Sequence, residues 1–364
     1  MRTRASVLMI LGIVAAMLVL AFAVAACGDD SDTTTSSEES TASTEAVTTT
    51  SGATETSTSE AGAEPEAGKV YKIGITQIVS HPALDATAEG FIAALTDSGF
   101  VQDDNVVYDM QNAQGDMANA TTIAQKFVGD NVDLILSIAT PTSQAAAKAT
   151  DTIPIVFAAV TDPVAAELVT NPDAPDGNIT GVSDLLPVAP HLELIKQIVP
   201  EVTVVGLLYN AGETNSVALV EQEKAAAAAM GLEIVEATAA SSSEVLGAAQ
   251  SLVGRCDVIS VLTDNTVVSA LESVVKVCQD NKIPLIAGDI DSVERGAVAA
   301  YAFDYRDHGY QAGLMAVKVL EGTPIAQIPV EYAQNLQLAI NEAAAAAMGV
   351  TIPDDLKAKA NTTF

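Results

Sequence analysis

Polar side chains gather at the ends of the apolar strands in this chain of 364 residues, and their types suit the binding of a small charged molecule. The folded chain would bring together the carboxylates of Asp264 and Asp291, with the amide of Asn265 beside them. Grouped carboxylates repel one another unless a cation or hydrogen-bond donors balance them. Hydroxyl groups at residues 140–143, with the N–H groups of the helix that follows, can hold an anion. The candidate site residues are Gln77, His81, Thr140, Thr142, Ser143, Thr161, Asp162, Asn210, Asn215, Ser216, Asp264, Asn265, Asp289 and Asp291.

Each of these residues also has a purely structural explanation, as a turn residue or a helix cap. Asn215 and Ser216 stand just before a predicted helix, and there capping explains them as well as ligand binding does. The grouping of acidic side chains favours the functional interpretation for Asp264, Asn265 and Asp291.

The elements that position these residues form a strand–helix alternation that occurs twice. An apolar strand at 70–78 and a helix at 83–95 open the first copy, and a strand at 202–208 and a helix at 216–230 open the second. Apolar strands separated by helices predict parallel sheets with right-handed crossovers, and two copies predict two lobes. Ligands of open α/β sheets bind beyond the carboxyl ends of the strands, where the candidate residues lie.

The N-terminus predicts export and attachment to a membrane by lipid. Arg2 and Arg4 precede an apolar stretch at 8–24, which ends in small residues and Cys27, as in a bacterial lipoprotein signal. Cleavage before Cys27 and acylation of its thiol would place the mature chain outside the cytoplasmic membrane. Residues 28–68 are almost entirely Ser, Thr, Asp, Glu, Ala and Gly, a composition that predicts a disordered tether.

Composition excludes one class of partner. The net charge is −31, because 47 acidic residues face 16 Lys and Arg, and no basic patch occurs anywhere. Such a surface repels phosphate backbones, so no nucleic-acid partner is expected. Besides Cys27 the chain has only Cys256 and Cys278, for which a disulfide and two free thiols both remain open. No cysteine or histidine spacing indicates a metal or another cofactor.

Several segments, taken in order, resemble the ABC-transporter substrate-binding proteins of the tryptophan/tyrosine type. The segments include GITQ at 74–77, HPALD at 81–85, NAQGD at 112–116, IATP at 138–141, VTDPVAA at 160–166, TDNTVV at 263–268 and DSVERGA at 291–297. The resemblance runs from about residue 69 to about residue 349 and implies a type I periplasmic-binding-protein fold, with two Rossmann-like α/β lobes joined by crossing segments.

The resemblance also implies how the chain divides. Residues 1–26 would be the signal peptide, and residues 27–68 the lipidated cysteine and tether. The N-terminal lobe would comprise 69–182 plus about 301–325, and the C-terminal lobe 183–300 plus about 326–364. An ABC permease with its ATPase would be the membrane partner, and the ligand would be a small molecule.

The family suggests an amino acid, possibly aromatic, as that ligand. We expect residues 140–143 to bind its carboxylate, and Asp264 and Asp291, with Asn265 beside them, to accept its ammonium. Phe157 and Tyr209 end strands near the expected cleft and could contact a ring.

Two other classes of function remain open. A sensory protein that presents its ligand to a receptor kinase would have the same lobes. A cleft enzyme has less support, because the sequence has no GxGxxG after a strand and no GxSxG motif, and neither His191 nor His308 falls at a strand end. We therefore expect a binding protein and not an enzyme.

Overall fold

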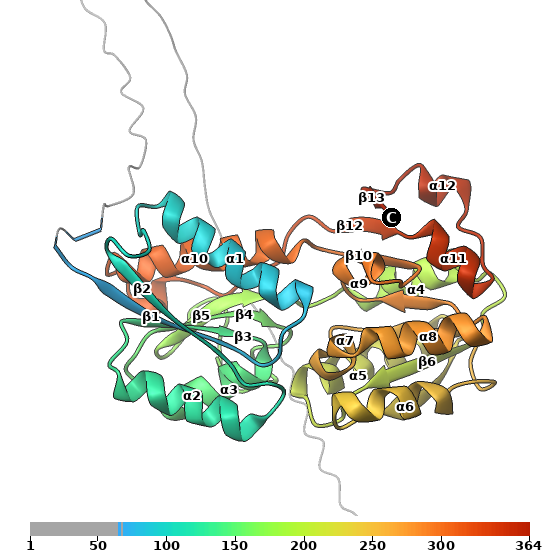
Figure 1. Ribbon diagram of the computed structural model, residues 1–364, viewed down its shortest axis with the longest axis horizontal. Coiled ribbons are helices and arrows are strands. Elements are labelled where there is room, and N and C mark those ends of the chain that lie inside the picture. The colour runs from blue at the N-terminus through green and yellow to red at the C-terminus, as the bar shows by residue number, and fades with distance from the viewer. Residues whose placement is uncertain (1–64, 67) are drawn as a thin grey trace, which may run out of the picture. The chain divides into compact units, whose positions relative to one another are not determined.

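The strands of the chain form two separate sheets, as the computed structural model shows (Figure 1). The structure describes residues 65–66 and 68–364. The predicted signal peptide, Cys27 and nearly all of the predicted tether lie outside this part of the chain. No helix within the described residues is long and apolar enough to cross a membrane.

The first sheet has six strands within the described residues, in the order β11-β5-β4-β3-β1-β2, and every neighbouring pair is parallel. Gln77 pairs with Asn112 on one side and with Ile138 on the other, so these strands reach the same edge together. The strands are β1 (Tyr71–Gln77), β2 (Val106–Asn112), β3 (Leu134–Ile138), β4 (Ile155–Val160), β5 (Ile179–Ser183) and β11 (Glu331–Tyr332).

The second sheet has seven strands in the described part of the chain, in the order β13-β12-β10-β9-β8-β6-β7. Its pairs are parallel except for the antiparallel pair of β10 and β12. The strands are β6 (Val204–Tyr209), β7 (Glu233–Thr238), β8 (Val258–Val261), β9 (Leu285–Ala287), β10 (Ala299–Ala302), β12 (Gln337–Ile340) and β13 (Thr362–Thr363). The predicted α/β class with two parallel-dominated sheets is confirmed.

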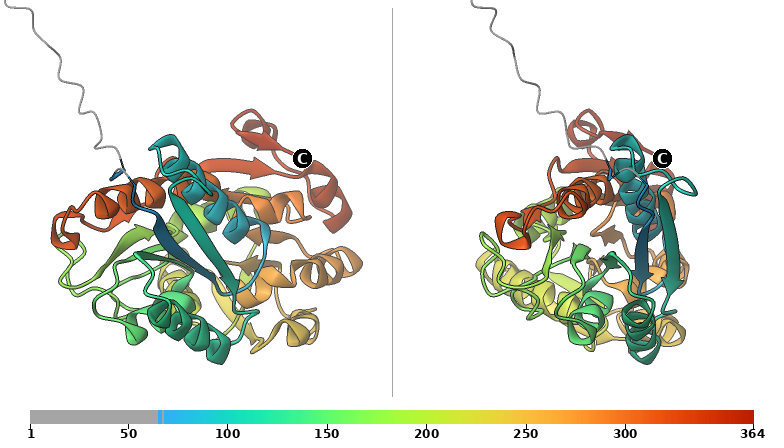
Figure 2. Two further views of the ribbon diagram at one scale, coloured as in Figure 1. Left: turned by 60° about the vertical axis from the view of Figure 1, so that its left-hand side comes forward. Right: turned by 90° about the vertical axis from the view of Figure 1, so that its left-hand side faces the viewer.

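Helices cover both faces of the first sheet, with α1 and α10 on one side and α2 and α3 on the other (Figures 1 and 2). These helices are α1 (Pro82–Asp97), α2 (Met117–Gly129), α3 (Thr140–Ala149) and α10 (Tyr305–Leu320). The helices of the second lobe are α4 (Val188–Ile198), α5 (Thr214–Ala229), α6 (Val245–Ser251), α7 (Asn265–Ser269), α8 (Leu271–Asn281), α9 (Asp291–Glu294), α11 (Glu342–Met348) and α12 (Asp354–Lys357). A short helical turn of this lobe is η1 (Ser242–Glu244), whereas η2 (Ile325–Gln327) precedes β11 of the first sheet.

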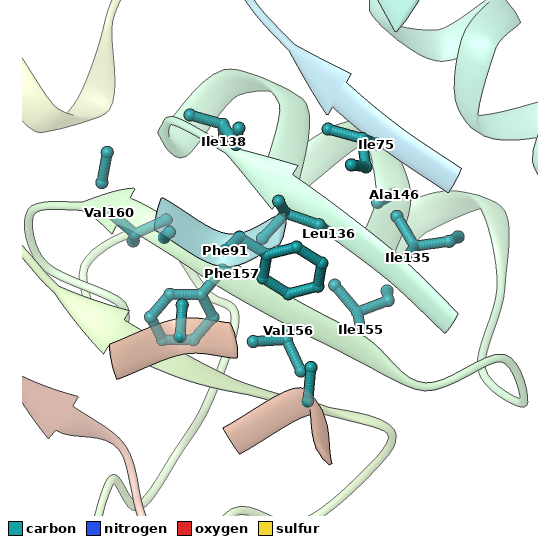
Figure 3. Packing of buried hydrophobic residues seen from close by; sticks show 14 of the residues in the cluster. Ile75, Phe91, Ile135, Leu136, Ile138, Ala146, Ile155, Val156, Phe157 and Val160 are labelled. Carbon is teal, nitrogen blue, oxygen red and sulfur yellow. The ribbon is translucent and has the colours of Figure 1, made fainter. Parts of the chain in front are cut away.

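Each sheet has its own core of small aliphatic side chains, and both sheets belong to one compact unit. In the first core Phe91 of α1 and Phe157 of β4 pack among Ile135, Leu136 and Ile155, all fully buried (Figure 3). Burying such side chains stabilises the fold by about 1.5–3 kcal/mol each, so the two sheets are stable platforms for the loops at their edges.

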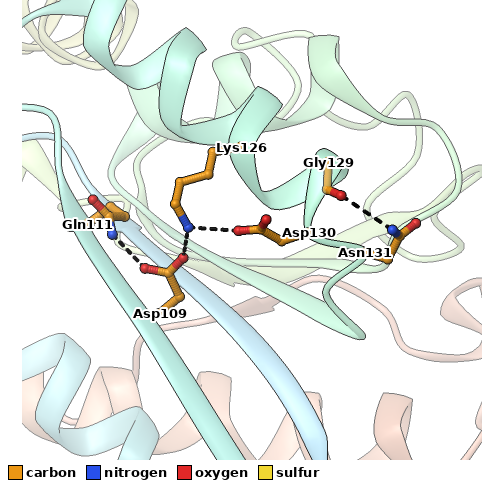
Figure 4. A network of polar contacts seen from close by, with 6 residues as sticks. All are labelled: Asp109, Gln111, Lys126, Gly129, Asp130 and Asn131. Carbon is orange, nitrogen blue, oxygen red and sulfur yellow. Dashed lines mark hydrogen bonds and ion pairs between the residues drawn. The ribbon is translucent and has the colours of Figure 1, made fainter.

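A polar network fixes α2 to the outermost strand of the first sheet (Figure 4). Lys126 of α2 forms ion pairs with Asp109 of β2 and with Asp130, the latter at 2.7 Å. Gln111 also donates to Asp109, at 2.5 Å. The network lies on the surface, where ion pairs contribute about 0–1 kcal/mol each, so it orients the edge strand more than it stabilises it.

The chain crosses between the lobes after β5, after β10 and after β11. The predicted third crossing near residue 325 is wrong, since Ile328 and Val330 belong to the first core and β11 pairs with β5. The strand repeat could not place this short edge strand, because it has no counterpart in the other copy. The second crossing also begins slightly later than predicted, because β10 extends to Ala302.

Candidate functional site

A narrow cavity lies at the carboxyl ends of the strands, with walls from both lobes. About 320 Å³ of space between protein atoms lies within it, open solvent included, but only about 20 Å³ is open to the centre of a water molecule, so the cavity must widen to admit a small-molecule ligand. We call it the inner cavity. Its lining residues are His81, Ala83, Leu84, Ala159, Thr161, Asp184, Asn215, Thr263, Asp264, Asn265, Val268, Asp289 and Tyr305.

Asp264 contributes the first of three buried carboxylates to this cavity. It follows β8 and caps α7 by accepting from the backbone N–H of Val267 at 2.7 Å. Its second oxygen accepts from the N–H of Asn210 and the hydroxyl of Ser216, each at 2.6 Å. Most of its hydrogen-bonding capacity is therefore used to hold the loops of the second lobe together.

Asp289 contributes the second carboxylate, after β9. Ser292 donates to it twice, from its backbone N–H at 2.7 Å and from its hydroxyl at 2.5 Å. Each carboxylate oxygen thus accepts one local bond, and a further donor from a ligand can still be accepted by either.

Asp184 contributes the third carboxylate from the other lobe, directly after β5. The hydroxyl of Tyr305 donates to it at 2.8 Å, and the hydroxyl of Thr161 at 3.0 Å. Tyr305 begins α10, just after the crossing that follows β10, so this acid connects three segments that are distant in sequence.

The titratable groups of the cavity walls are mainly acidic. Burial raises the pKa of Asp184 and of Asp289, and burial together with the neighbouring Glu213 raises the pKa of Asp264 to about 7. No Lys or Arg is among the described residues that line the cavity. A cation bound beside these three acids would favour their ionised forms.

The first turn of α1 forms part of the same wall. His81 is the N-cap residue of α1, but no side chain caps this helix, and Ala83 and Leu84 of its first turn line the cavity. Uncapped N–H groups and the helix dipole favour an anion at this point. Burial, followed by the charge of Arg295, lowers the pKa of His81 to about 4, so the imidazole is neutral near pH 7.

Unpaired polar atoms in the wall also indicate a ligand. Nδ1 of His81, Oδ1 of Asn215 and Oγ1 of Thr263 are buried and have no partner among the described residues. Buried polar atoms are nearly always hydrogen-bonded in folded proteins, so three such atoms around one cavity indicate that a bound molecule completes their bonding.

A wider outer groove shares Asn265 with the inner cavity and holds about 1250 Å³, open solvent included. Ile78, Met117 and Pro141 of the first lobe face Asn210 and Thr214 of the second across it. Gln144 donates to Thr214 across the same interface, at 3.4 Å. Glu213 accepts from the side chain of Asn265 at 2.5 Å, which fixes the residue that the two spaces share.

The structure brings some of the predicted residues together and separates others. Those that line the inner cavity are His81, Thr161, Asn215, Asp264, Asn265 and Asp289. Asn210 lines the outer groove, and Ser216 lies behind Asp264. Those that line neither space are Gln77, Thr140, Thr142, Ser143, Asp162 and Asp291.

Local hydrogen bonds explain most of the residues that lie outside the cavity. Thr142 donates to the carbonyl of Ile138 at 2.6 Å, and Ser143 to that of Ala139 at 3.0 Å, so both hydroxyls are used inside the turn. Gln77 donates to Asp85 at 2.6 Å, and Asp162 accepts from two backbone N–H groups of the following turn. Thr140 is buried with its hydroxyl unpaired, but it does not reach either space.

The two aromatic residues that were expected to contact a ligand ring do not line the inner cavity. Phe157 is fully buried in the first core, and Tyr209 donates from its hydroxyl to Glu236 at 2.7 Å, away from the cavity. Tyr305 is the aromatic residue that lines the cavity. Cys256 and Cys278 are both free thiols.

Asp184, Tyr305 and Glu213 are site residues that the sequence interpretation missed. The signal for Asp184 was present, because this acid directly follows an apolar strand, and Asp264 and Asp289 come within three residues of the ends of theirs. Tyr305 had no such signal, because only the crossing between lobes brings the start of α10 to the cavity.

Comparison with known proteins identifies the family. A family model described as "ABC transporter substrate binding protein" matches residues 72–364. The chain belongs to this family. It is 44% identical over 287 residues to the tyrosine-binding protein of Clostridioides difficile strain R20291, covering 79% of this chain and 83% of that protein.

Two solved structures of related substrate-binding proteins superpose on this chain to different degrees. A Streptococcus pneumonia ABC domain in complex with L-Trp is 36% identical, covers 81% of this chain and 100% of that one, and gives a TM-score of 0.79. A ligand-free, open substrate binding protein from Clostridium difficile is 43% identical, covers 80% and 99%, and gives a TM-score of 0.62. The structure is therefore closer to the ligand-bound relative, although the open one is nearer in sequence.

Proposed function

We propose that this substrate-binding protein captures an aromatic amino acid, tryptophan or tyrosine, in the inner cavity and delivers it to the permease of an ABC import system. The observation that carries the proposal is the inner cavity itself, in which buried acids from both lobes lie with the uncapped start of α1 and unpaired polar atoms. Relatives named for tyrosine binding and for a complex with L-Trp support this ligand class.

The ammonium group of the ligand is assigned to the acids. Asp289 and Asp184 each accept only two local bonds, one on each oxygen, and they lie on different lobes, so one ammonium can bridge both. Asp264 adds negative charge, and Asp289 replaces Asp291 in the expected ammonium site because Asp291 does not line the cavity.

The carboxylate of the ligand is assigned to the first turn of α1. This helix has 16 residues, and the N–H groups of Ala83 and Leu84 have no side-chain cap. A carboxylate at such a helix start is stabilised by hydrogen bonds and by the dipole. The turn therefore replaces Thr140, Thr142 and Ser143, which line neither space, in the expected carboxylate site.

The side chain of the ligand is assigned to the apolar part of the wall. Leu84, Val268 and the ring of Tyr305 line the cavity beside the charged groups. Aromatic rings pack well against aliphatic side chains and against the edge or face of another ring.

Closure of the lobes follows from this division of contacts. A ligand whose ammonium and carboxylate contact both lobes binds the closed arrangement better than the open one, and so shifts the population toward it. The bond from Gln144 to Thr214 forms only when the lobes are together. The closed form is then the one that a permease recognises.

The location of the protein is part of the proposal. Acylation of Cys27 would anchor it to the outer face of the cytoplasmic membrane, and the acidic, polar segment at 28–68 would let the binding unit reach its permease.

Isothermal titration calorimetry on the detergent-solubilised full chain tests the ligand class. L-Tryptophan and L-tyrosine should bind, whereas tryptamine, which lacks the carboxylate, indole-3-propionate, which lacks the ammonium, and glucose should not. Binding of glucose alone, or equal binding of tryptophan and indole-3-propionate, would overturn the proposal.

A further inference from the structure

The backbone of Ala159, in the wall of the inner cavity, is held by a histidine far away in the sequence. Nε2 of His308 accepts from the N–H of Ala159 at 2.8 Å, across 149 positions of the chain. Both residues are buried, and Ala159 lines the cavity while His308 does not. His308 therefore contacts the backbone of a residue in the cavity wall without lining the cavity itself.

A β-bulge explains why Ala159 needs this partner. Phe157 pairs with Gly181 and Val160 with Ser183, so β4 has one residue more than β5 between these pairs. At such a bulge a strand residue loses its ladder partner, and a buried N–H without a partner is destabilising. His308 provides the acceptor that β5 cannot provide.

The backbone of Ala159 is also strained. Its φ is +54°, a left-handed conformation that residues other than glycine rarely adopt. Such a conformation persists only where its surroundings enforce it, and it is common at ligand sites. The bond from His308 is a contact that holds the N–H of Ala159 in this conformation.

Packing fixes His308 in turn. Its ring lies 5.7 Å from the rings of both Phe303 and Tyr305, centroid to centroid. The start of α10 is pressed onto α1, since a Cβ on Gly309 would lie 2.0 Å from the carbonyl oxygen of Thr87. The same ring cluster holds Tyr305, whose hydroxyl donates to Asp184.

The protonation state of the His308 ring allows Nε2 to accept a hydrogen bond. Burial lowers the pKa of His308 to about 3, so the ring is neutral at physiological pH. Because Nε2 accepts, the single ring proton is on Nδ1, which is buried and has no hydrogen-bond partner among the described residues.

We propose that His308 is a positioning residue for ligand binding, which holds the left-handed backbone of Ala159 and the ring of Tyr305 in the conformation that the inner cavity requires. This inference rests on the proposed function, because the ligand contacts the wall that these two residues form. The hydrogen bond itself can be tested without any ligand.

Two substitutions of similar polarity separate positioning from general stability. His308→Gln keeps an acceptor at about the reach of Nε2, whereas the side chain of His308→Asn is too short. We expect the Gln variant to bind tryptophan nearly as the unmodified chain does, and the Asn variant to bind at least tenfold more weakly. Adding Ala159→Gly to the Asn variant should recover much of the affinity, because glycine adopts a positive φ without strain.

His191→Gln is the matched control. His191 is also fully buried, but it lies in the second lobe against Ser260 and does not line the cavity. This variant should lower the unfolding temperature without changing affinity. Equal affinities of the Gln and Asn variants of His308, whether high or low, would overturn the proposal, and so would the absence of recovery with Ala159→Gly.

A spectroscopic measurement on the unmodified full chain needs no variant to fold. The ¹⁵N NMR signals of the imidazole of His308 should show the proton on Nδ1, and a proton on Nε2 would overturn the proposal. If the unmodified chain binds no amino acid at all, the proposed function fails while this tautomer result still decides whether the hydrogen bond exists.

Discussion

Replacing Asp289 by asparagine should weaken ligand binding without weakening the fold. The carboxylate is almost fully buried, lines the inner cavity and has local bonds only to Ser292. Asp289→Asn keeps the shape and removes the charge that we assign to the ammonium of the ligand. A hydrogen bond to a charged group contributes about 1.5–3 kcal/mol, so the dissociation constant should rise by about 10- to 150-fold.

The stability of the ligand-free protein should respond in the opposite direction. Burial raises the pKa of Asp289, so the folded state binds this proton more tightly than the unfolded state does. Such a group contributes stability at low pH and loses it as pH rises through the folded-state pKa. At neutral pH the neutral asparagine avoids that loss, and the unfolding temperature without ligand should stay the same or rise.

Asp291→Asn is the matched control for this experiment. Burial, followed by the charge of Asp289, raises the pKa of Asp291 to about 6, but Asp291 does not line the cavity. Its affinity should stay within about threefold of the unmodified chain. Calorimetry and thermal unfolding on all three proteins make the comparison. Unchanged affinity in Asp289→Asn, or an equal loss in Asp291→Asn, would refute the assignment of the ammonium site.

Three further predictions follow from the same structure. Tryptophan affinity should fall as pH decreases from about 8 to about 5, because Asp264, with a pKa raised to about 7, becomes neutral. The ligand-free protein should become more stable over the same range. Calorimetry and thermal unfolding at several pH values check the fall in affinity and the rise in stability. Gly90→Ala should lower the unfolding temperature by roughly 2–10 °C, since the added Cβ would lie 1.9 Å from the carbonyl oxygen of Arg306. A melting curve like that of the unmodified chain would contradict the close packing of α1 on α10. Cys27→Ser should move the protein from the membrane fraction to the soluble fraction of cells that express it, with ligand affinity unchanged; a variant that stays with the membrane would show that the cysteine is not its anchor.

The sequence allowed much of the fold to be predicted, because apolar strands buried on both faces have a clear pattern. The repeat located β1 and β6, which open its two copies, and the sheet edge at which the polar residues gather. It did not place β11, since a strand of two residues has no pattern to detect.

Only part of the candidate site was predicted, because the sequence does not show which hydrogen bonds form on folding. Thr142, Ser143 and Asp162 stand at strand ends just as Asp264 and Asp289 do, but their bonds are used within their own turns. Sequence shows where a polar residue falls along a strand, but it does not show which bonds that residue makes after folding. Tyr305 and His308 reach the cavity region only through the packing of α10 against the first lobe.

The most direct test of the account is a crystal structure of the protein with bound L-tryptophan or L-tyrosine. We predict the ligand in the inner cavity, its ammonium within hydrogen-bonding distance of Asp289 and Asp184, and its carboxylate at the N–H groups of Ala83 and Leu84. An amino acid bound in the outer groove, or bound in the inner cavity with its carboxylate toward Asp289, would contradict it.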